Sequence, residues 1–202
     1  MCRSVCARCR FAVSWRDGEN SFRRLAKAYA EGRQDELPAC LAEEPVPLSQ
    51  IPFWYRDLTE FENRIIYYES SRGCPFSCSY CLSSIDKRVR LRDLALVKEE
   101  LQFFLDQKVP QVKFIDRTFN CNHQHAMEIW SYIQEHDNGI TNFHFEISAD
   151  LLNGEELALL AKMRPGLVQL EIGVQSTNLQ TLEAVRTHTI WNSCGMQWYG
   201  SI

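Results

Sequence analysis

The chain has 202 residues, 45% of them hydrophobic, and a net charge of −4, a balance typical of one globular domain and not of a disordered chain. Its apolar runs are far shorter than the roughly 20 residues needed to span a bilayer, and no charged-then-apolar leader opens it, so we expect a cytoplasmic protein without a membrane partner. Residues 1–34 hold eight Lys/Arg against three Asp/Glu, but few aromatic residues are interleaved with them, so a solvated face is a better interpretation than a nucleic-acid-binding arm.

The opening of the chain is irregular, and the first helix is expected over residues 21–31, ending at Gly32. Its apolar side chains recur at helical spacing and share one face. They are Phe22, Leu25, Ala26 and Tyr29. Three prolines between residues 35 and 50 then mark a linker.

Strands and helices alternate through the rest of the chain. The expected strands cover residues 64–70, 111–116, 142–148 and 167–175, and the expected helices cover residues 93–107, 122–136, 153–163 and 178–186. Four βα units in series predict an α/β fold with a parallel sheet and right-handed crossovers.

Polar and apolar residues alternate along the third and fourth strands, in "NFHFEIS" and "VQLEIGVQ". A parallel strand buried on both faces would be apolar nearly throughout. A barrel or half-barrel with a polar, ligand-holding lumen therefore fits these strands better than a flat doubly wound sheet.

The loop after the first strand carries Cys74, Cys78 and Cys81 at C-x3-C-x2-C spacing. These cysteines therefore lie at the carboxyl end of a strand, the face of a barrel on which active sites form. Nine cysteines, odd in number and clustered, favour metal or cluster ligation over a disulfide framework. Three thiolates hold three irons of a 4Fe-4S cluster and leave the fourth free to bind a small molecule. The alternative is a zinc or ferredoxin-type site, which needs a fourth ligand, for which Cys121 or Cys40 is available.

Histidines give no comparable pattern. His123 and His125 stand two residues apart at a helix start and cannot share a face, so we expect both at the solvated surface. His144 is expected to face the lumen without a partner. We assign no metal to any histidine.

The cysteine spacing, with the aromatic Tyr80 directly before the last cysteine, resembles the cluster loop of the radical S-adenosylmethionine (radical SAM) enzymes. The resemblance covers about residues 18–188 and implies a partial parallel (βα) barrel, with about four of the family's six βα units present. The segments "YYESSRGCPFSCSYCLSS", "VKFIDRTFN", "FHFEISADLL" and "LEIGVQSTN" are similar to the branch whose full-length members carry a cobalamin-binding domain before the barrel.

The resemblance assigns roles to individual residues. The three cysteines are the expected cluster ligands, and the backbone of Tyr80 is expected to face the adenine of SAM. Asp116 and Arg117 stand where the family places groups that receive the methionine amino group, although "IDRTF" replaces the commoner Gly-Glu pair. Polar side chains of the third and fourth strands either contact the ribose or methionine parts of SAM or form a structural polar network. These side chains are Glu146, Glu171 and Gln175.

The ends of the chain depart from the family. The expected organisation is an unmatched segment over residues 1–17, a remnant of the end of a cobalamin-binding domain over 18–34, a linker over 35–60, a truncated radical SAM core over 61–188 and an unmatched tail over 189–202. The first segment repeats the cysteine spacing at Cys2, Cys6 and Cys9, but no strand precedes them, so an auxiliary cluster is the lesser alternative. Cobalamin is expected only in a full-length relative.

The resemblance thus implies a radical SAM enzyme, or the truncated core of one, that reductively cleaves SAM to a 5'-deoxyadenosyl radical. Its expected partners are SAM, an unknown substrate and a reducing electron donor such as flavodoxin or ferredoxin. The alternative is an iron-sulfur protein that transfers electrons or holds a structural cluster without SAM cleavage. Because the fifth and sixth strands are missing, we expect this chain to hold a cluster but to cleave SAM poorly.

Overall fold

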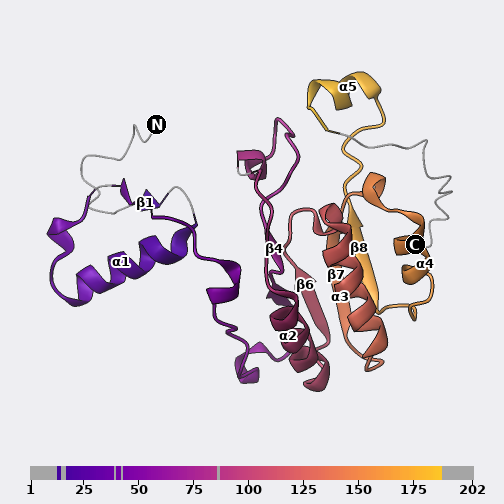
Figure 1. The fold of residues 1–202 in the computed structure, drawn as a ribbon, viewed down its shortest axis with the longest axis horizontal. Helices are drawn as coiled ribbons and strands as arrows, with labels where there is room; N and C mark the ends of the chain where they lie inside the picture. The colour runs from indigo at the N-terminus through magenta and orange to yellow at the C-terminus, as the bar shows by residue number, and fades with distance from the viewer. Residues whose placement is uncertain (1–12, 15–16, 39, 42, 86, 188–202) are drawn as a thin grey trace. The chain divides into compact units, whose positions relative to one another are not determined.

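The computed structural model describes residues 13–14, 17–38, 40–41, 43–85 and 87–187, in two compact units, Met1–Pro52 and Phe53–Ile202 (Figure 1). Cys2, Cys6 and Cys9 lie outside the described residues, as does the tail over residues 189–202. Within the described ranges, no helix has the length and apolar character needed to cross a bilayer.

The first unit contains the predicted helix, which begins three residues earlier than expected and ends before Gly32, where φ is +67°. The elements of this unit are β1 (Val13–Ser14), α1 (Gly18–Ala30), η1 (Gln34–Glu36), β2 (Cys40–Leu41) and η2 (Leu48–Gln50). The helix buries Ser21 and Ala28, whereas Phe22 is 69% and Tyr29 is 49% exposed. The predicted apolar face is therefore not the buried face of α1 among the described residues.

The second unit is built on a parallel sheet. Its strands, in spatial order, are β3 (Ile66–Tyr68), β6 (Gln111–Phe114), β7 (Asn142–Ile147) and β8 (Val168–Ile172). Its helices are α2 (Leu94–Asp106), α3 (His123–Glu135), α4 (Gly154–Leu160) and α5 (Leu179–Ala184), and its short 3-10 turns are η3 (Thr59–Phe61), η4 (Leu82–Ile85), η5 (Phe119–Cys121) and η6 (Ala149–Leu151). Two two-residue strands, β4 (Ser71–Arg72) and β5 (Arg90–Leu91), form a separate antiparallel pair. The predicted series of four βα units is confirmed.

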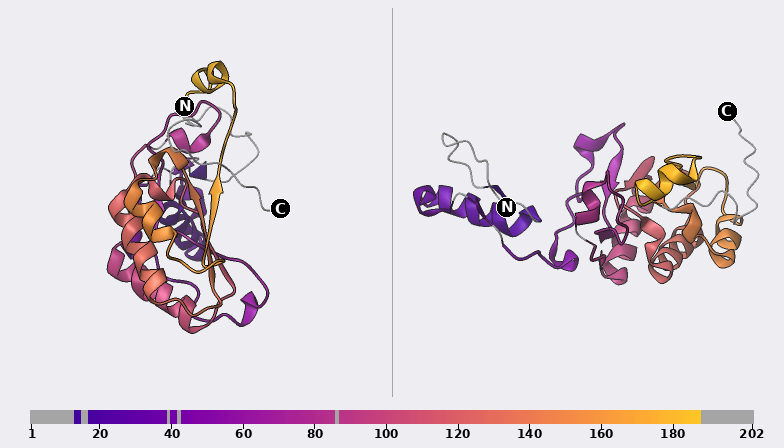
Figure 2. Two further views of the ribbon diagram at one scale, coloured as in Figure 1. Left: turned by 90° about the vertical axis from the view of Figure 1, so that its right-hand side faces the viewer. Right: turned by 90° about the horizontal axis from the view of Figure 1, so that it is seen from above.

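Helices α2, α3 and α4 lie on one side of the sheet (Figure 2). Alternate residues of β6 and β7 point toward them and are buried, so the core lies between this face and the helices. Aromatic rings fill much of it: the Phe145 ring lies 4.4 Å from that of Phe114 and 4.3 Å from that of Phe119, measured between centroids. The other face of the sheet carries the polar residues that the alternating pattern predicted.

Residues 53–61 pack onto this core, although most of them fall in the expected linker. The Phe53 ring meets that of Phe104 edge to face at 5.3 Å, and the Tyr55 hydroxyl donates to the Tyr67 carbonyl at 2.7 Å. The second unit accordingly begins at Phe53.

Four asparagine or aspartate side chains cap the helices of the second unit at the positions where the sequence predicted helix starts. Asp93 accepts from the amides of the first turn of α2, and Asn122 and Asn178 do so for α3 and α5. Asn153 forms a capping box with Glu156 at the start of α4. Each helix therefore starts at a fixed residue beyond the carboxyl end of a strand.

Candidate functional site

The carboxyl ends of the four parallel strands lie at one edge of the sheet, and the loops that follow them carry the predicted site residues. The cysteine loop follows β3, residues 115–122 follow β6, residues 148–153 follow β7 and residues 173–178 follow β8. Asn120 Nδ2 donates to the Ser148 carbonyl, and the Ser148 amide donates back to Asn120 Oδ1, both at 2.9 Å. Two of the four loops are thus held together by a reciprocal pair of hydrogen bonds.

The cysteine loop is closed at its base by the antiparallel pairing of β4 with β5. Gly73 follows β4 with φ of +102°, and a Cβ at this position would lie 2.2 Å from the backbone oxygen of Arg88. Glycine is the residue that fits both the backbone conformation and the close approach. The glycine before Cys74 in the motif therefore closes the base of the loop.

The three predicted ligands are reduced cysteines of this loop, outside any disulfide. Cys74 is buried at its base, with Sγ 3.5 Å from Thr118 Oγ1, while Cys78 and Cys81 are half-buried, and Cys78 Sγ lies 3.5 Å from Thr187 Oγ1. No three His, Cys, Asp or Glu side chains of the described residues come close enough to hold a single metal ion. Each thiolate of a 4Fe-4S cluster binds a different iron, so its ligands are spaced more widely than those of one ion. Three reduced thiols on one loop are a donor set that fits such a cluster.

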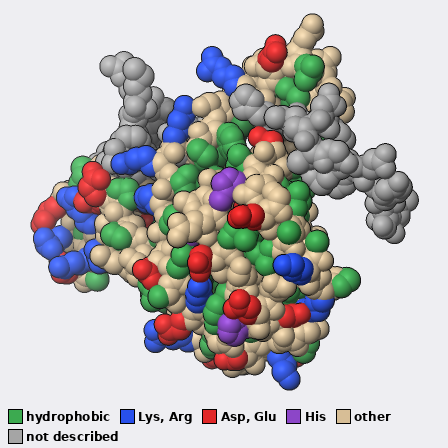
Figure 3. Space-filling model, turned by 45° about the vertical axis from the view of Figure 1, so that its right-hand side comes forward, with side chains coloured by type: hydrophobic (Ala, Val, Ile, Leu, Met, Phe, Trp, Pro, Cys, Tyr) green, Lys and Arg blue, Asp and Glu red, His purple; other side chains and the backbone are tan. Residues whose placement is uncertain are grey.

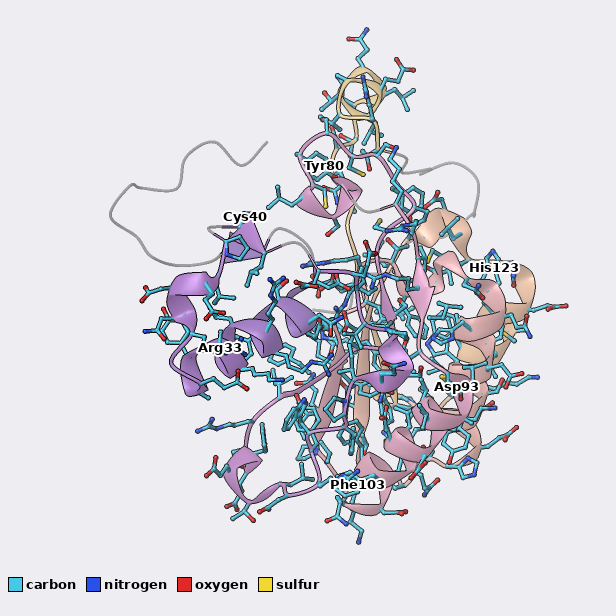
Figure 4. All side chains as sticks on the ribbon, turned by 60° about the vertical axis from the view of Figure 1, so that its left-hand side comes forward. Arg33, Cys40, Tyr80, Asp93, Phe103 and His123 are labelled. Atoms are coloured by element: carbon cyan, nitrogen blue, oxygen red, sulfur yellow. The ribbon has the colours of Figure 1, made fainter. Side chains whose placement is uncertain are left out.

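The tip of the loop contacts the end of α5. The Ser79 amide donates to the Val185 carbonyl at 3.0 Å, and Thr187 lies against Cys78. Tyr80 is 55% exposed in the same loop, near α5 (Figure 4). Partial desolvation and the neighbouring thiols raise the pKa of the Tyr80 hydroxyl, against a hydrogen bond with Thr187 that lowers it. The residues after α5 therefore complete one side of the cysteine loop.

Asp116 is fully buried at the end of β6 and joins it to the stem of the cysteine loop. Its carboxylate accepts from the Ser70 amide at 3.0 Å and from the Ser70 hydroxyl at 2.7 Å. Burial raises the pKa of Asp116 to about 6, although hydrogen bonds from Ser71 and Ser70 lower it. Arg117, the next residue, is exposed.

His125 extends this buried network from the first turn of α3. Its Nε2 lies 3.1 Å from Ser70 Oγ, and the residue is only 2% exposed. Burial lowers the pKa of His125. The prediction that it lies at the solvated surface is wrong, because the start of α3 faces the strand ends. His123 is half-exposed, and its Nδ1 lies 2.9 Å from Glu156 Oε1.

The open face of the sheet carries a charged cluster from β6, β7 and β8. Lys113 Nζ lies 2.9 Å from Glu171 Oε2 and 3.8 Å from Glu146 Oε1, and His144 Nε2 lies 3.1 Å from Glu171 Oε2. Hydrogen bonding with Lys113 lowers the pKa of Glu171 and raises that of Lys113. The sequence predicted Glu146, Glu171 and His144 on this face, but it missed Lys113, and it gave His144 no partner.

Gln175 lies beyond the end of β8, in the left-handed region with φ of +60°. Its side chain folds back over Gly173, where a Cβ would lie 2.3 Å from Gln175 Nε2. Gln175 is therefore held at the strand end, beside the other loops of the site, and not in the row of charged side chains further down the sheet.

A buried ion pair joins the β4–β5 pair, at the base of the cysteine loop, to the helix layer. Arg92, directly after β5, donates from Nε to Glu100 Oε2 at 2.9 Å and from Nη2 to Glu100 Oε1 at 2.5 Å. The Tyr68 hydroxyl also donates to Glu100, at 2.6 Å. Both charged residues are 7% exposed. Together with Tyr68, the ion pair links β3, the β4–β5 pair and α2 within the core.

Comparison with known proteins identifies this arrangement. The sequence model of the radical SAM superfamily matches residues 68–194, well over half of the chain. The chain belongs to the radical SAM superfamily. Members of this superfamily use a 4Fe-4S cluster and SAM, as the cysteine loop predicted.

A relative that is similar in sequence supports this assignment. An uncharacterized methyltransferase of Pyrococcus horikoshii is 28% identical over 201 residues, a match that covers 88% of this chain and 43% of that protein. The chain thus spans less than half the length of this curated relative.

Two structures of the radical SAM methyltransferase TsrM from Kitasatospora setae share its fold at 20% identity. The structure with tryptophan and a SAM analogue gives a TM-score of 0.52 and covers 61% of this chain and 25% of TsrM. The structure with cobalamin and a [4Fe-4S] cluster gives 0.54, with 69% and 27% covered. The predicted fold, a partial radical SAM barrel, is confirmed.

Sequence reasoning missed several residues around the radical SAM cysteine loop. Ser70, Thr118 and Thr187 make their contacts only because separate loops meet at the sheet edge. Cys121, named as an alternative fourth ligand, ends η5 in the loop after β6, where burial and then the nearby Cys74 and Asp116 raise the pKa of its thiol to about 11. Cys40, the other alternative, belongs to the first unit.

Proposed function

We propose that this chain holds a 4Fe-4S cluster through Cys74, Cys78 and Cys81 and reductively cleaves SAM to methionine and a 5'-deoxyadenosyl radical. The observation that carries the proposal is the glycine-closed loop of three reduced cysteines at the carboxyl edge of a parallel sheet, in a chain of the radical SAM superfamily. When bound, the cluster would supply one electron to SAM, breaking the bond between sulfur and the 5' carbon. A one-electron donor such as flavodoxin or ferredoxin would reduce the chain before each cleavage.

The chain's own residues would position the reactants. The buried stem of the loop fixes Cys74, while Ser79 and the α5 end hold the tip that carries Cys78 and Cys81. We assign the backbone of Tyr80 to the adenine of SAM, because that residue stands at the exposed tip. Productive cleavage needs the reacting groups held closely, since misplacement by about 1 Å costs roughly 100-fold in rate.

Polar groups at the strand ends would hold the rest of SAM. We assign Arg117 and Gln175 to its methionine or ribose parts, because both are exposed at the carboxyl edge. Both carboxylate oxygens of Asp116 accept from Ser70, so we assign it an indirect part, through the stem of the loop. Glu146 and Glu171 pair with Lys113 lower on the open face. We propose that these two face the lumen and the substrate side of SAM.

The names of the relatives support methyl transfer as the overall reaction, because the Pyrococcus horikoshii protein and TsrM are both described as methyltransferases. We further propose that the radical SAM core, predicted over residues 61–188, includes the packed residues 53–60, and that the rest of the expected linker over 35–60 joins it to a remnant of a cobalamin-binding domain over 18–34. Cobalamin binding is proposed only for a full-length relative.

On the face drawn in Figure 3, basic and acidic side chains of the described residues are interspersed, in keeping with the weakly acidic composition.

Anaerobic reconstitution with iron and sulfide tests the cluster. The wild-type chain should gain about four irons and a brown thiolate-to-iron absorbance, and the variant with Cys74, Cys78 and Cys81 all replaced by Ala should gain neither. The matched control is the Cys40→Ala, Cys121→Ala double variant, which should reconstitute fully. Full iron in the triple variant would overturn the ligand assignment.

Addition of SAM and dithionite to the reconstituted chain separates the enzyme from its alternative. Formation of 5'-deoxyadenosine supports the proposed cleavage. Because we expect slow cleavage by this chain, the assay must be able to detect less than one turnover. A stable cluster with no 5'-deoxyadenosine at that sensitivity supports the iron-sulfur electron-transfer or structural protein. Deletion of residues 1–17 should leave the iron content unchanged, because we propose that Cys2, Cys6 and Cys9 are not ligands.

A further inference from the structure

Two threonine hydroxyls lie beside two different thiols of the cysteine loop. Thr118 Oγ1 is 3.5 Å from Cys74 Sγ, and Thr187 Oγ1 is 3.5 Å from Cys78 Sγ. The partners are 44 and 109 residues apart in the chain, so both contacts are products of the fold. Both distances are within the longer hydrogen-bonding reach of sulfur.

Thr118 belongs to the loop after β6 and is 7% exposed, beside Cys74 at 8%. Its hydroxyl donates to the Arg117 carbonyl at 2.8 Å. In the free thiol, the sulfur's own proton therefore occupies the contact with Oγ1. A thiolate that ligates iron has lost this proton and presents a charged acceptor, to which the single proton of the Thr118 hydroxyl would turn from the Arg117 carbonyl.

Thr187 is held against the tip of the loop by backbone hydrogen bonds. Its amide donates to the Leu182 carbonyl at 3.1 Å, and the Ser79 amide donates to the Val185 carbonyl at 3.0 Å. In the free thiol, Cys78 donates to Thr187 Oγ1. Ligation of Cys78 would reverse this bond, so that the hydroxyl becomes the donor.

Hydrogen bonds to ligating sulfurs stabilise the more negatively charged state of an iron-sulfur cluster and so raise its reduction potential. A bond to an ionised acceptor is stronger than one between neutral groups, and exclusion of water strengthens it further. Thr118 and Cys74 are both buried, whereas Thr187 and Cys78 are partly exposed. The first pair therefore has the larger expected effect.

We propose that Thr118 and Thr187 are positioning residues that act through Cys74 and Cys78, each donating a hydrogen bond to a ligating sulfur and raising the reduction potential of the cluster. This inference rests on the proposed function, because it requires the cluster. It concerns how easily the chain accepts an electron, before any SAM is bound.

The test is a redox titration of the reconstituted chain without SAM, followed by electron paramagnetic resonance of the reduced cluster. Thr118→Val and Thr187→Val remove the hydroxyl but keep the shape of the side chain. At the wild-type midpoint, each should lower the ratio of reduced to oxidised cluster, by about three- to tenfold for Thr118→Val. The two effects should multiply in the double variant, because they act on different sulfurs.

Serine variants and a distant threonine provide the controls. Thr118→Ser and Thr187→Ser keep the hydroxyl and should titrate as wild type, as should Thr181→Val, which alters an exposed residue of α5. Valine variants with full iron and an unchanged ratio would overturn the inference. A serine variant that shifts as far as its valine counterpart would also overturn it, because the hydroxyl would then not be the cause.

A second measurement starts from the wild-type chain, and its first result does not require any variant to fold. The reduced wild-type cluster, exchanged into D2O, should show coupling to exchangeable deuterons in electron-nuclear double resonance, and the couplings lost in Thr118→Val should return in Thr118→Ser. Wild-type spectra without any exchangeable coupling would contradict the inference. Failure of the wild-type chain to assemble a cluster would instead refute the proposed function, and the inference with it.

Discussion

Replacement of Asp116 by Asn should change how the stability of the chain depends on pH. Asp116 is fully buried, and its carboxylate accepts two hydrogen bonds from Ser70, whose hydroxyl also lies 3.1 Å from His125 Nε2. An asparagine amide can donate to the Ser70 hydroxyl, which can then donate to His125. The variant therefore keeps a connected network without a titrating group at position 116.

The magnitude follows from the pKa of Asp116, which burial raises from its ordinary value of 3.8 to about 6. Because this pKa is higher in the folded than in the unfolded chain, the folded state binds the proton more tightly. The stability that this tighter proton binding contributes is fully present below about pH 4 and is lost as the pH rises through 6. The loss is about 3 kcal/mol in total, of which roughly 2 kcal/mol falls between pH 4.5 and 7.5.

The assay is urea unfolding of the cluster-free, reduced chain at several pH values between 4.5 and 7.5. The free energy of unfolding of Asp116→Asn should rise by about 2 kcal/mol relative to wild type across this range. His125 titrates in both proteins, so its opposite contribution largely cancels in the difference. Asp106→Asn, at an exposed carboxylate of α2, should follow wild type. A constant difference between Asp116→Asn and wild type at every pH would refute the assignment of a raised pKa.

Two substitutions test the anchors of the cysteine loop. Gly73→Ala places a Cβ 2.2 Å from a backbone oxygen at φ of +102°, and should destabilise the chain by about 2–5 kcal/mol and lower its iron content, whereas Gly154→Ala, with open space around it, should do neither. Glu100→Ala removes the carboxylate partner of the buried Arg92 and should cost about 3–5 kcal/mol in urea unfolding, against less than about 0.5 kcal/mol for the exposed Glu99→Ala. If Gly73→Ala were as stable as Gly154→Ala, or Glu100→Ala as stable as Glu99→Ala, the proposed role of that residue in anchoring the loop would be wrong.

The fold was predictable because local signals agreed with one another along the chain. Asp93, Asn122, Asn153 and Asn178 each mark a helix start by side-chain chemistry that acts within three residues. The alternation in "NFHFEIS" likewise fixes which face of β7 is buried. Such features need no knowledge of distant parts of the chain.

The finer features of the site were not predictable in this way, because they depend on which loops meet. Nothing near His125 in the sequence indicates that its ring reaches Ser70, 55 residues earlier. Lys113 pairs with Glu171, 58 residues later, because β6, β7 and β8 are neighbours in register. The buried face of α1 was missed for a related reason, since an apolar stripe predicts burial only when a partner covers it.

The base of the cysteine loop is buried, whereas its tip is partly exposed. This difference bears on how a cluster would assemble. Gly73, the buried Cys74 and the Arg92 ion pair fix the base within the core. The tip is partly exposed and reaches the residues after α5 through the Ser79 amide, which donates to the Val185 carbonyl, and through the contacts of Cys78 and Tyr80 with Thr187. Metal ligation stabilises most the segments that are least stable without it. Cys74 therefore offers a preformed first ligand, and binding of two further irons of the cluster by Cys78 and Cys81 would order the tip against α5.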